Sequence, residues 1–193
     1  MFVDFDHIYL MDDAFWRGAL TVESVDEKVD PWALLDGRKR PTTSVVFRHA
    51  MGKTPMDLVR ATHVAIDLIS DRTYRLLRDE GVTGWETYPV EISGEHGERI
   101  EGYRGLRVTG RCGKIDNSRS PSVWRPARVP EATPYQAWMG FFFDPETWDG
   151  SDVFMPPGTA FVFVTERVKV AFERAKLRNF DFRRPAEIER IML

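Results

Sequence analysis

One run, Gly158–Arg167, constrains the fold more than any other stretch of the sequence. Its phenylalanine and valine residues form an apolar segment of strand length, and such side chains favour a strand buried on both faces. Thr165 stands where a helix N-cap would be, and Glu166 puts a negative charge in the first turn, where the helix dipole favours it. Helical spacing of apolar residues follows at Val168, Ala171, Phe172 and Ala175. The run predicts a buried strand followed by a capped helix, and Asn179–Phe182 predicts a second strand.

The same pattern occurs a second time, 95 positions earlier in the chain, where Leu68–Arg72 falls on Phe163–Arg167 and Trp85-Glu86 on Phe180-Asp181. Each copy predicts a strand, a capped helix, a short turn and another strand. Two copies are too few for a solenoid. We therefore predict an α+β fold with a mixed or antiparallel sheet. It contains two similar strand-helix-strand units, about 62–92 and 158–184, whose helices pack on the sheet.

The other segments are less regular, and a length of 193 residues suits a single domain, residues 1–193. Residues 1–60 predict an irregular N-terminal part with an edge strand near Asp6–Met11. Met139–Phe143 predicts a further buried strand. Residues 116–134 are rich in Ser, Pro and Arg and have no periodicity, so they predict a long loop.

Cys112 is the only cysteine, which excludes an intrachain disulfide and any zinc site built from several cysteines. A single cysteine fits a reducing compartment. The N-terminus lacks the basic and apolar regions of a signal peptide. No apolar run reaches the roughly 18 residues that a membrane-spanning helix needs. We therefore expect a cytoplasmic protein that does not engage a membrane.

Charge is distributed unevenly along the chain. Residues 1–36 carry nine acidic and two basic side chains, residues 99–128 carry eight basic and two acidic ones, and residues 129–163 carry five acidic and no basic ones. Acidic surfaces steer basic partners and raise association rates, and tryptophans near turns supply anchors for protein recognition. These arguments select the candidate partner-binding residues Asp12, Asp13, Trp16, Trp32, Trp148, Asp149 and Asp152.

Catalytic and cofactor signatures are few. The four histidines have no partner at metal-ligand spacing, so we expect neither a metal nor another cofactor. One alternative left open is an enzyme whose site draws on Cys112, His96, Asp67 or His49. Asp67 interrupts an apolar strand, and we expect it at a sheet edge that faces solvent. The other alternative is a nucleic-acid-binding module that uses Arg99–Arg128, although a pI near 5.9 argues against it.

A family resemblance connects these observations. The block from Asp152 to Phe182 resembles immunity proteins of bacterial polymorphic toxin systems, in particular a myxobacterial-type immunity domain, and the block from Ile69 to Ile92 fits the same pattern. The resemblance implies a protein that binds and neutralises a cognate toxin encoded beside it. It also implies stoichiometric protein-protein binding without catalysis or a cofactor. The sequence identifies neither the toxin nor the oligomeric state, and it leaves a homo-oligomer open.

Overall fold

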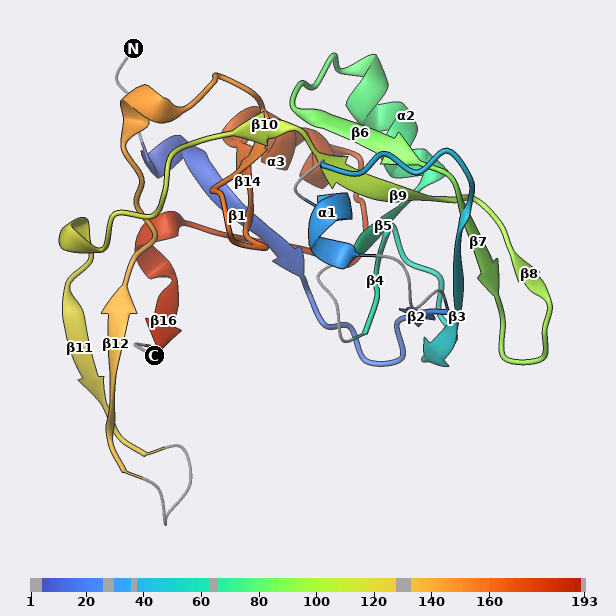
Figure 1. Cartoon of the computed structure of the whole chain (residues 1–193), viewed down its shortest axis with the longest axis horizontal. Coiled ribbons are helices and arrows are strands. Elements are labelled where there is room, and N and C mark those ends of the chain that lie inside the picture. The colour runs from blue at the N-terminus through green and yellow to red at the C-terminus, as the bar shows by residue number, and fades with distance from the viewer. Residues whose placement is uncertain (1–4, 26–29, 36–37, 63–65, 128–132, 192–193) are drawn as a thin grey trace.

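A computed structural model describes residues 5–25, 30–35, 38–62, 66–127 and 133–191 (Figure 1). Its α-helices are α1 (Pro31–Leu35), α2 (Asp71–Asp79) and α3 (Glu166–Arg174). Its strands are β1 (Ile8–Asp13), β2 (Thr21–Ser24), β3 (Val45–Met51), β4 (Leu58–Arg60), β5 (Asp67–Ser70), β6 (Trp85–Tyr88), β7 (Val90–Ser93), β8 (Arg99–Ile100), β9 (Tyr103–Val108), β10 (Gly110–Arg111), β11 (Ser122–Arg125), β12 (Tyr135–Met139), β13 (Val153–Met155), β14 (Val162–Thr165), β15 (Phe180–Arg183) and β16 (Glu189–Ile191). The described chain is rich in strand, with a few helices, and its sheets are antiparallel or mixed, as the sequence predicts at the level of class.

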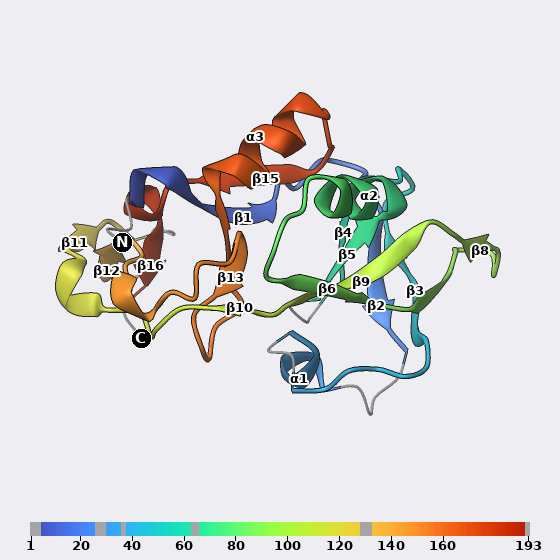
Figure 2. The same ribbon diagram turned by 90° about the horizontal axis from the view of Figure 1, so that it is seen from above.

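Two sheets form the centre of the molecule. The first has the order β4-β5-β9-β6, and the second has the order β10-β13-β14-β1-β15. All neighbouring strands are antiparallel except β10, which pairs with β13 in parallel. Helix α2 lies against the first sheet, α3 lies against the second, and the two helices contact each other. Helix α1 lies on the opposite side of the sheets from α2 and α3 (Figure 2).

An offset of 95 residues relates the two sheets element by element. Adding 95 to the bounds of β4, β5, α2 and β6 yields the bounds of β13, β14, α3 and β15, and adding 95 to β1 yields β9. The strand registers agree as well. Leu68 pairs with Gly105 where Phe163 pairs with Leu10. We call residues 8–88 the first half and residues 103–183 the second half.

The halves exchange their first strands. Strand β1 belongs by sequence to the first half but lies between β14 and β15 in the second sheet, and β9 lies between β5 and β6 in the first. The sequence prediction of an edge strand near Asp6–Met11 is therefore wrong, because β1 is central. Residues Ile8 to Met11 are all buried. The alternation of aspartate with apolar residues before β1 suggested a strand with one face exposed to solvent. In the structure, β1 pairs with a strand on each of its edges, and both of its faces are covered.

The two central helices begin and end in similar ways. Ser70 caps α2, and its hydroxyl accepts a hydrogen bond from Thr73 N at 3.1 Å. Thr165 occupies the N-cap position of α3 as predicted, but its side chain accepts no capping hydrogen bond. Gly81 and Lys176 follow the two helices at equivalent positions, with φ of 62° and 52°. This left-handed conformation ends each helix.

Asp57, in the first half, is buried and hydrogen-bonds across to the second half. It accepts hydrogen bonds from the Ser70 hydroxyl at 2.8 Å and from Arg178 N, in the other half, at 2.8 Å. The Arg72 guanidinium lies 3.4 Å from Asp57 and also donates to the carbonyl of Ala175, at the C-terminus of α3. The first half thereby caps the helix of the second.

Asp152 repeats this arrangement from the second half. Its carboxylate accepts hydrogen bonds from the Thr165 hydroxyl at 3.1 Å, from Thr83 N at 3.0 Å and from Arg167 at 3.1 Å. Arg167 also donates to the carbonyl of Glu80, at the C-terminus of α2. Each buried acid is thus satisfied by groups from both halves, as burial of a charged group requires.

Two outer segments depart from the sequence prediction. The predicted loop 116–134 contains a 3-10 helix, Asn117–Arg119, and the hairpin strand β11, which pairs with β12. The sequence does not show the alternation typical of a strand here, because Trp124 is exposed and prolines stand on either side of β11. The strand predicted over 139–143 ends at Met139, because Gly140 turns the chain with φ of 92°. Phe141 and Phe143 then enter the core from a loop.

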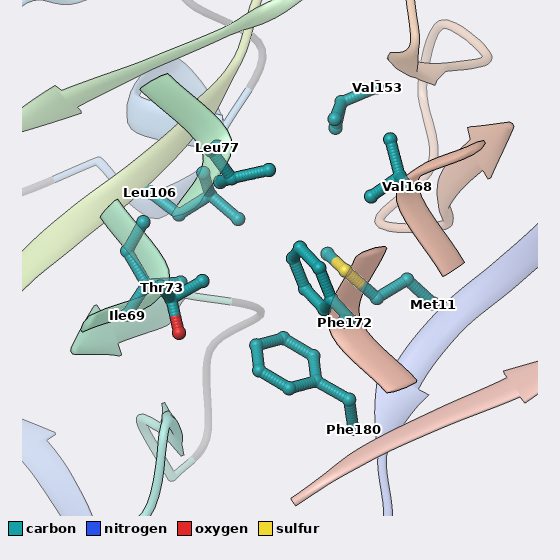
Figure 3. Close-up of a pocket in the computed structure, with 9 residues that line it drawn as sticks. All are labelled: Met11, Ile69, Thr73, Leu77, Leu106, Val153, Val168, Phe172 and Phe180. Atoms are coloured by element: carbon teal, nitrogen blue, oxygen red, sulfur yellow. The ribbon is translucent and has the colours of Figure 1, made fainter. Parts of the chain in front are cut away.

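An apolar void lies where α2 and α3 meet (Figure 3). It is lined by Met11, Ile69, Thr73, Leu77, Leu106, Val153, Val168, Phe172 and Phe180. Its volume of about 10 Å³ is at the lower limit for a single water, and the apolar lining disfavours one. Leu77 and Phe172 occupy equivalent positions in the two halves and face each other across it. The void is therefore a packing junction rather than a ligand site.

Replacing Phe172 with alanine should lower the free energy of unfolding by about 3–5 kcal/mol, because the side chain fills this junction and is 2% exposed. Val170→Ala is the control on the same helix, since Val170 is 48% exposed, and we expect about 0.5 kcal/mol or less. Urea unfolding followed by circular dichroism measures both. Equal losses would contradict the proposed role of the junction.

Strand exchange predicts that the halves depend on each other. If the chain is divided between His96 and Gly97, in the exposed turn between β7 and β8, neither fragment should unfold cooperatively alone. The first central sheet then lacks β9 and the second lacks β1, and each of these strands pairs with a strand on both of its edges. An equimolar mixture should form a 1:1 complex that regains cooperative unfolding, measured by calorimetry and light scattering. A fragment that folds alone as a monomer would show that a half can use its own first strand.

Candidate partner-binding site

The turn after β1 presents two aromatic side chains to solvent. Phe15 is 74% exposed and Trp16 is 60% exposed. Phe15 has φ of 52°, a left-handed conformation that costs roughly 1–2 kcal/mol for a residue with a β-carbon. We call residues 13–16 the aromatic turn. Strained and exposed aromatic residues of this kind occur at functional sites, where the surrounding structure must hold them.

Hydrogen bonds hold the aromatic turn at both ends. A carboxylate oxygen of Asp13, itself 6% exposed, accepts from Phe15 N at 2.6 Å. Buried Asn179 accepts from Ala14 N through its carbonyl at 3.4 Å and from Trp16 N through its side chain at 3.3 Å. Asn179 is also left-handed, with φ of 71°, as is Gly84 at the equivalent position. The turn is therefore fixed before any partner arrives.

A surface hollow of about 340 Å³ adjoins the aromatic turn and is lined by Asp12, Asp13, Ala14, Phe15, Asp181 and Arg183. We call it the acidic hollow. Asp12 and Asp181 are cross-strand neighbours, and like charges in that position repel. Arg60 and Arg183 relieve the repulsion, because each places a guanidinium nitrogen 2.7 Å from an Asp12 oxygen.

Asp67 is a buried acid that pairs with Arg60, the same arginine that pairs with Asp12. The sequence predicted a solvent-facing edge position, which is wrong: Asp67 is 7% exposed and pairs with Arg60 at 3.1 Å. Burial raises the pKa of the Asp67 carboxyl, and the Arg60 guanidinium opposes the shift. Strand β5 lies between β4 and β9, so its residues have neighbours on both sides. Asp67 thus fixes Arg60, which in turn orients Asp12.

The other candidate residues lie elsewhere. Trp32 is 52% exposed and belongs to α1, which contacts β9 of the first sheet. Trp148 is half-buried and packs on Phe154 with a ring separation of 5.2 Å. Asp149 accepts from Arg111 N at 2.7 Å, and Asp152 is the buried acid described above. Of the seven candidates, Asp12, Asp13 and Trp16 are brought together.

Sequence reasoning missed Phe15, Asp181, Arg60, Arg183 and Asn179. The offset of 95 could have found Asn179, because Asn179 and Gly84 both tolerate a left-handed backbone and share a position in the two halves. The exposure of Phe15 and the pairing of Asp12 with Asp181 depend on the strand exchange, for which we find no local signal in the sequence.

The residues of the enzyme alternative do not converge. His49 and His96 line one hollow of about 370 Å³, together with Lys53, Glu95 and others, whereas neither Cys112 nor Asp67 lines it. Within the described ranges, no group of three or more His, Cys, Asp or Glu residues is placed to hold a metal ion. Burial raises the pKa of the Cys112 thiol to about 12, so the reactive thiolate is scarce at neutral pH.

The basic stretch of the nucleic-acid alternative is largely paired. Arg104, Arg107 and Arg125 lie 2.8, 3.0 and 2.6 Å from Asp71, Glu86 and Glu189 respectively. Arg128 lies outside the described residues. Such pairing reduces the positive potential that binding to a phosphate backbone requires.

No helix in the part of the chain that the structure describes is long and apolar enough to cross a membrane.

The exposed aromatic turn, whose backbone is held by hydrogen bonds and which lies beside a charged hollow, is a candidate protein-binding surface. Residues 17–187 match the model of the immunity protein family Imm11. The chain therefore belongs to the Imm11 immunity protein family, which confirms the resemblance noted in the sequence. The matched residues begin directly after the aromatic turn, and a search of curated proteins found no match.

Cys112 should react slowly with a thiol reagent in the native protein, because its side chain is buried and its thiol pKa is raised. Labelling at about pH 8 should accelerate to the rate of a free cysteine, whose pKa is about 8.5, when denaturant unfolds the chain. Absorbance of the released thiolate measures both rates. Rapid labelling of the folded chain would restore Cys112 as a candidate nucleophile.

Proposed function

We propose that this chain protects the cytoplasm of the cell that makes it by binding one molecule of a cognate protein toxin and blocking its activity. Membership of the Imm11 immunity protein family supports a role in toxin neutralisation. The observation that carries the choice of surface is the aromatic turn, where the rings of Phe15 and Trp16 are exposed and their backbone N–H groups are held by hydrogen bonds.

Fixed aromatic residues favour tight binding for a physical reason. Ordering a loop at an interface costs free energy, and a turn whose backbone is ordered beforehand avoids that part of the cost. Asp13 and Asn179 hold the backbone of the turn in the free protein. The free energy of burying the two rings is then available for affinity. Neutralisation in this scheme requires only that the bound protein covers a surface the toxin needs.

The proposal expects a secreted protein with a C-terminal toxin domain to be encoded beside this gene, and the test begins with that domain. The domain and this chain are purified separately, and complex formation is measured by light scattering and calorimetry. We expect a 1:1 complex and loss of toxicity when the two are produced together. A toxic domain that neither binds this chain nor is neutralised by it would refute the proposal.

Phe15→Ala and Trp16→Ala should each weaken this complex by about 30-fold, which corresponds to the roughly 2 kcal/mol of a binding hot spot. Trp124→Ala is the matched control, because Trp124 is 69% exposed but lies on the β11–β12 hairpin. Its complex should have an unchanged dissociation constant. An equal loss for all three variants would show that the aromatic turn has no special role.

A further inference from the structure

The two halves allow the acidic hollow to be compared with its counterpart in the same chain. Under the 95-residue offset, Asp12 corresponds to Arg107 and Asp181 to Glu86, and both pairs are cross-strand neighbours in the same register. Arg183 corresponds to Tyr88. The same position on the two sheets therefore carries different chemistry.

In the first sheet the part of this position at Tyr88 is covered. Helix α1 contacts β9, and Leu34, which is 1% exposed, belongs to the same core cluster as Tyr88. The chain that leaves α1 places Arg40 3.9 Å from Glu86. The cover is a short apolar helix followed by a basic segment.

In the second sheet the residues that the structure describes leave this position as an open hollow. The segment at the same offset from α1 is 126–130, and β11 carries the chain away from the two sheets before residues 126 and 127 (Figure 1). Residues 128–130 lie outside the described part of the chain. The exposures differ accordingly. Tyr88 is 3% exposed, whereas the Arg183 side chain is 43% exposed; the side chains of Glu86 and Asp181 are similar, at 40% and 48%.

The net negative charge of the acidic hollow favours a positively charged binding partner. The hollow and the ion pairs beneath it contain four carboxylates, from Asp12, Asp13, Asp67 and Asp181, against two guanidinium groups, from Arg60 and Arg183. One oxygen of Asp181 lies 3.5 Å from the Arg183 guanidinium, and because the Asp181 side chain is 48% exposed, its carboxylate can also meet an incoming cation. Phe15 forms an apolar wall of the hollow, and the face of its ring attracts a cation.

We propose that the acidic hollow takes a basic segment of the toxin, in which a lysine or arginine lies beside an apolar side chain. The apolar side chain packs against Phe15, and the cation lies between Asp181 and Asp13. The segment completes on the second sheet the cover that α1 and Arg40 provide on the first. This inference rests on the proposed function and names the chemistry of its partner.

The experiment reverses one charge at the hollow and one elsewhere. Asp181→Lys and Glu146→Lys make the same change of charge; Glu146 is exposed in the 3-10 helix Pro145–Thr147 and does not line the hollow. Association with the toxin domain encoded by the neighbouring gene is followed by stopped-flow fluorescence at low and high salt. Asp181→Lys should slow association about fivefold at low salt and flatten its salt dependence, since complementary charge acts mainly on association rates. Glu146→Lys should associate at the wild-type rate.

A second readout locates the occupant directly. Hydrogen exchange of the toxin domain should show a protected segment of net positive charge in the wild-type complex, and weaker protection of that segment with Asp181→Lys. Equal association rates for the two variants, or an acidic protected segment, would overturn the inference while leaving toxin binding intact. A wild-type chain that forms no complex would instead overturn the proposed function and this inference together.

Discussion

Two buried carboxylates, Asp57 and Asp152, are the interactions on which the rest of the fold depends. Each lies in one half of the chain and accepts a backbone N–H of the other half, while the arginine beside it caps the opposite helix. An unpaired buried carboxylate is costly in free energy, and the cost is avoided only when all its donors are present. Separation of the halves would remove a donor from both acids. The acids therefore couple the positions of α2 and α3 to the pairing of both sheets.

The same coupling explains where the halves are alike and where they differ. Strand bounds, registers and helix ends agree between them because they are built around the shared junction of α2 and α3. The segment between β1 and β4 differs from the segment between β9 and β13, since the first contains α1 and the second contains the β11–β12 hairpin. The aromatic turn begins the first of these segments. A conserved junction within the chain and divergent outer segments are compatible with a scaffold that leaves its surface free to specialise.

Local patterns in the sequence predicted the local structure well. The strand, N-cap and helix at Gly158–Arg167 follow from residues that are adjacent in the chain, and so does the repeat around Ser70. The sequence did not predict which strands pair with each other. Nothing near Ile8 indicates that β1 pairs with β14 and β15, more than 150 positions away, so a central strand was predicted as an edge. The site was missed in part for the same reason, because Asp181 and Asn179 join Asp12 and Phe15 only through that pairing.

The position of β1 has a consequence for how the protein is made. The strand leaves the ribosome long before its two neighbours in the sheet, which end at Thr165 and Arg183. At the usual rates of translation, on the order of 5–20 residues per second, β1 waits roughly 8–30 s for those neighbours. The aromatic turn, anchored by Asn179, cannot be ordered before then. The binding surface is therefore unfinished until β15 has been synthesised, so any protection that this surface gives would start only after that point.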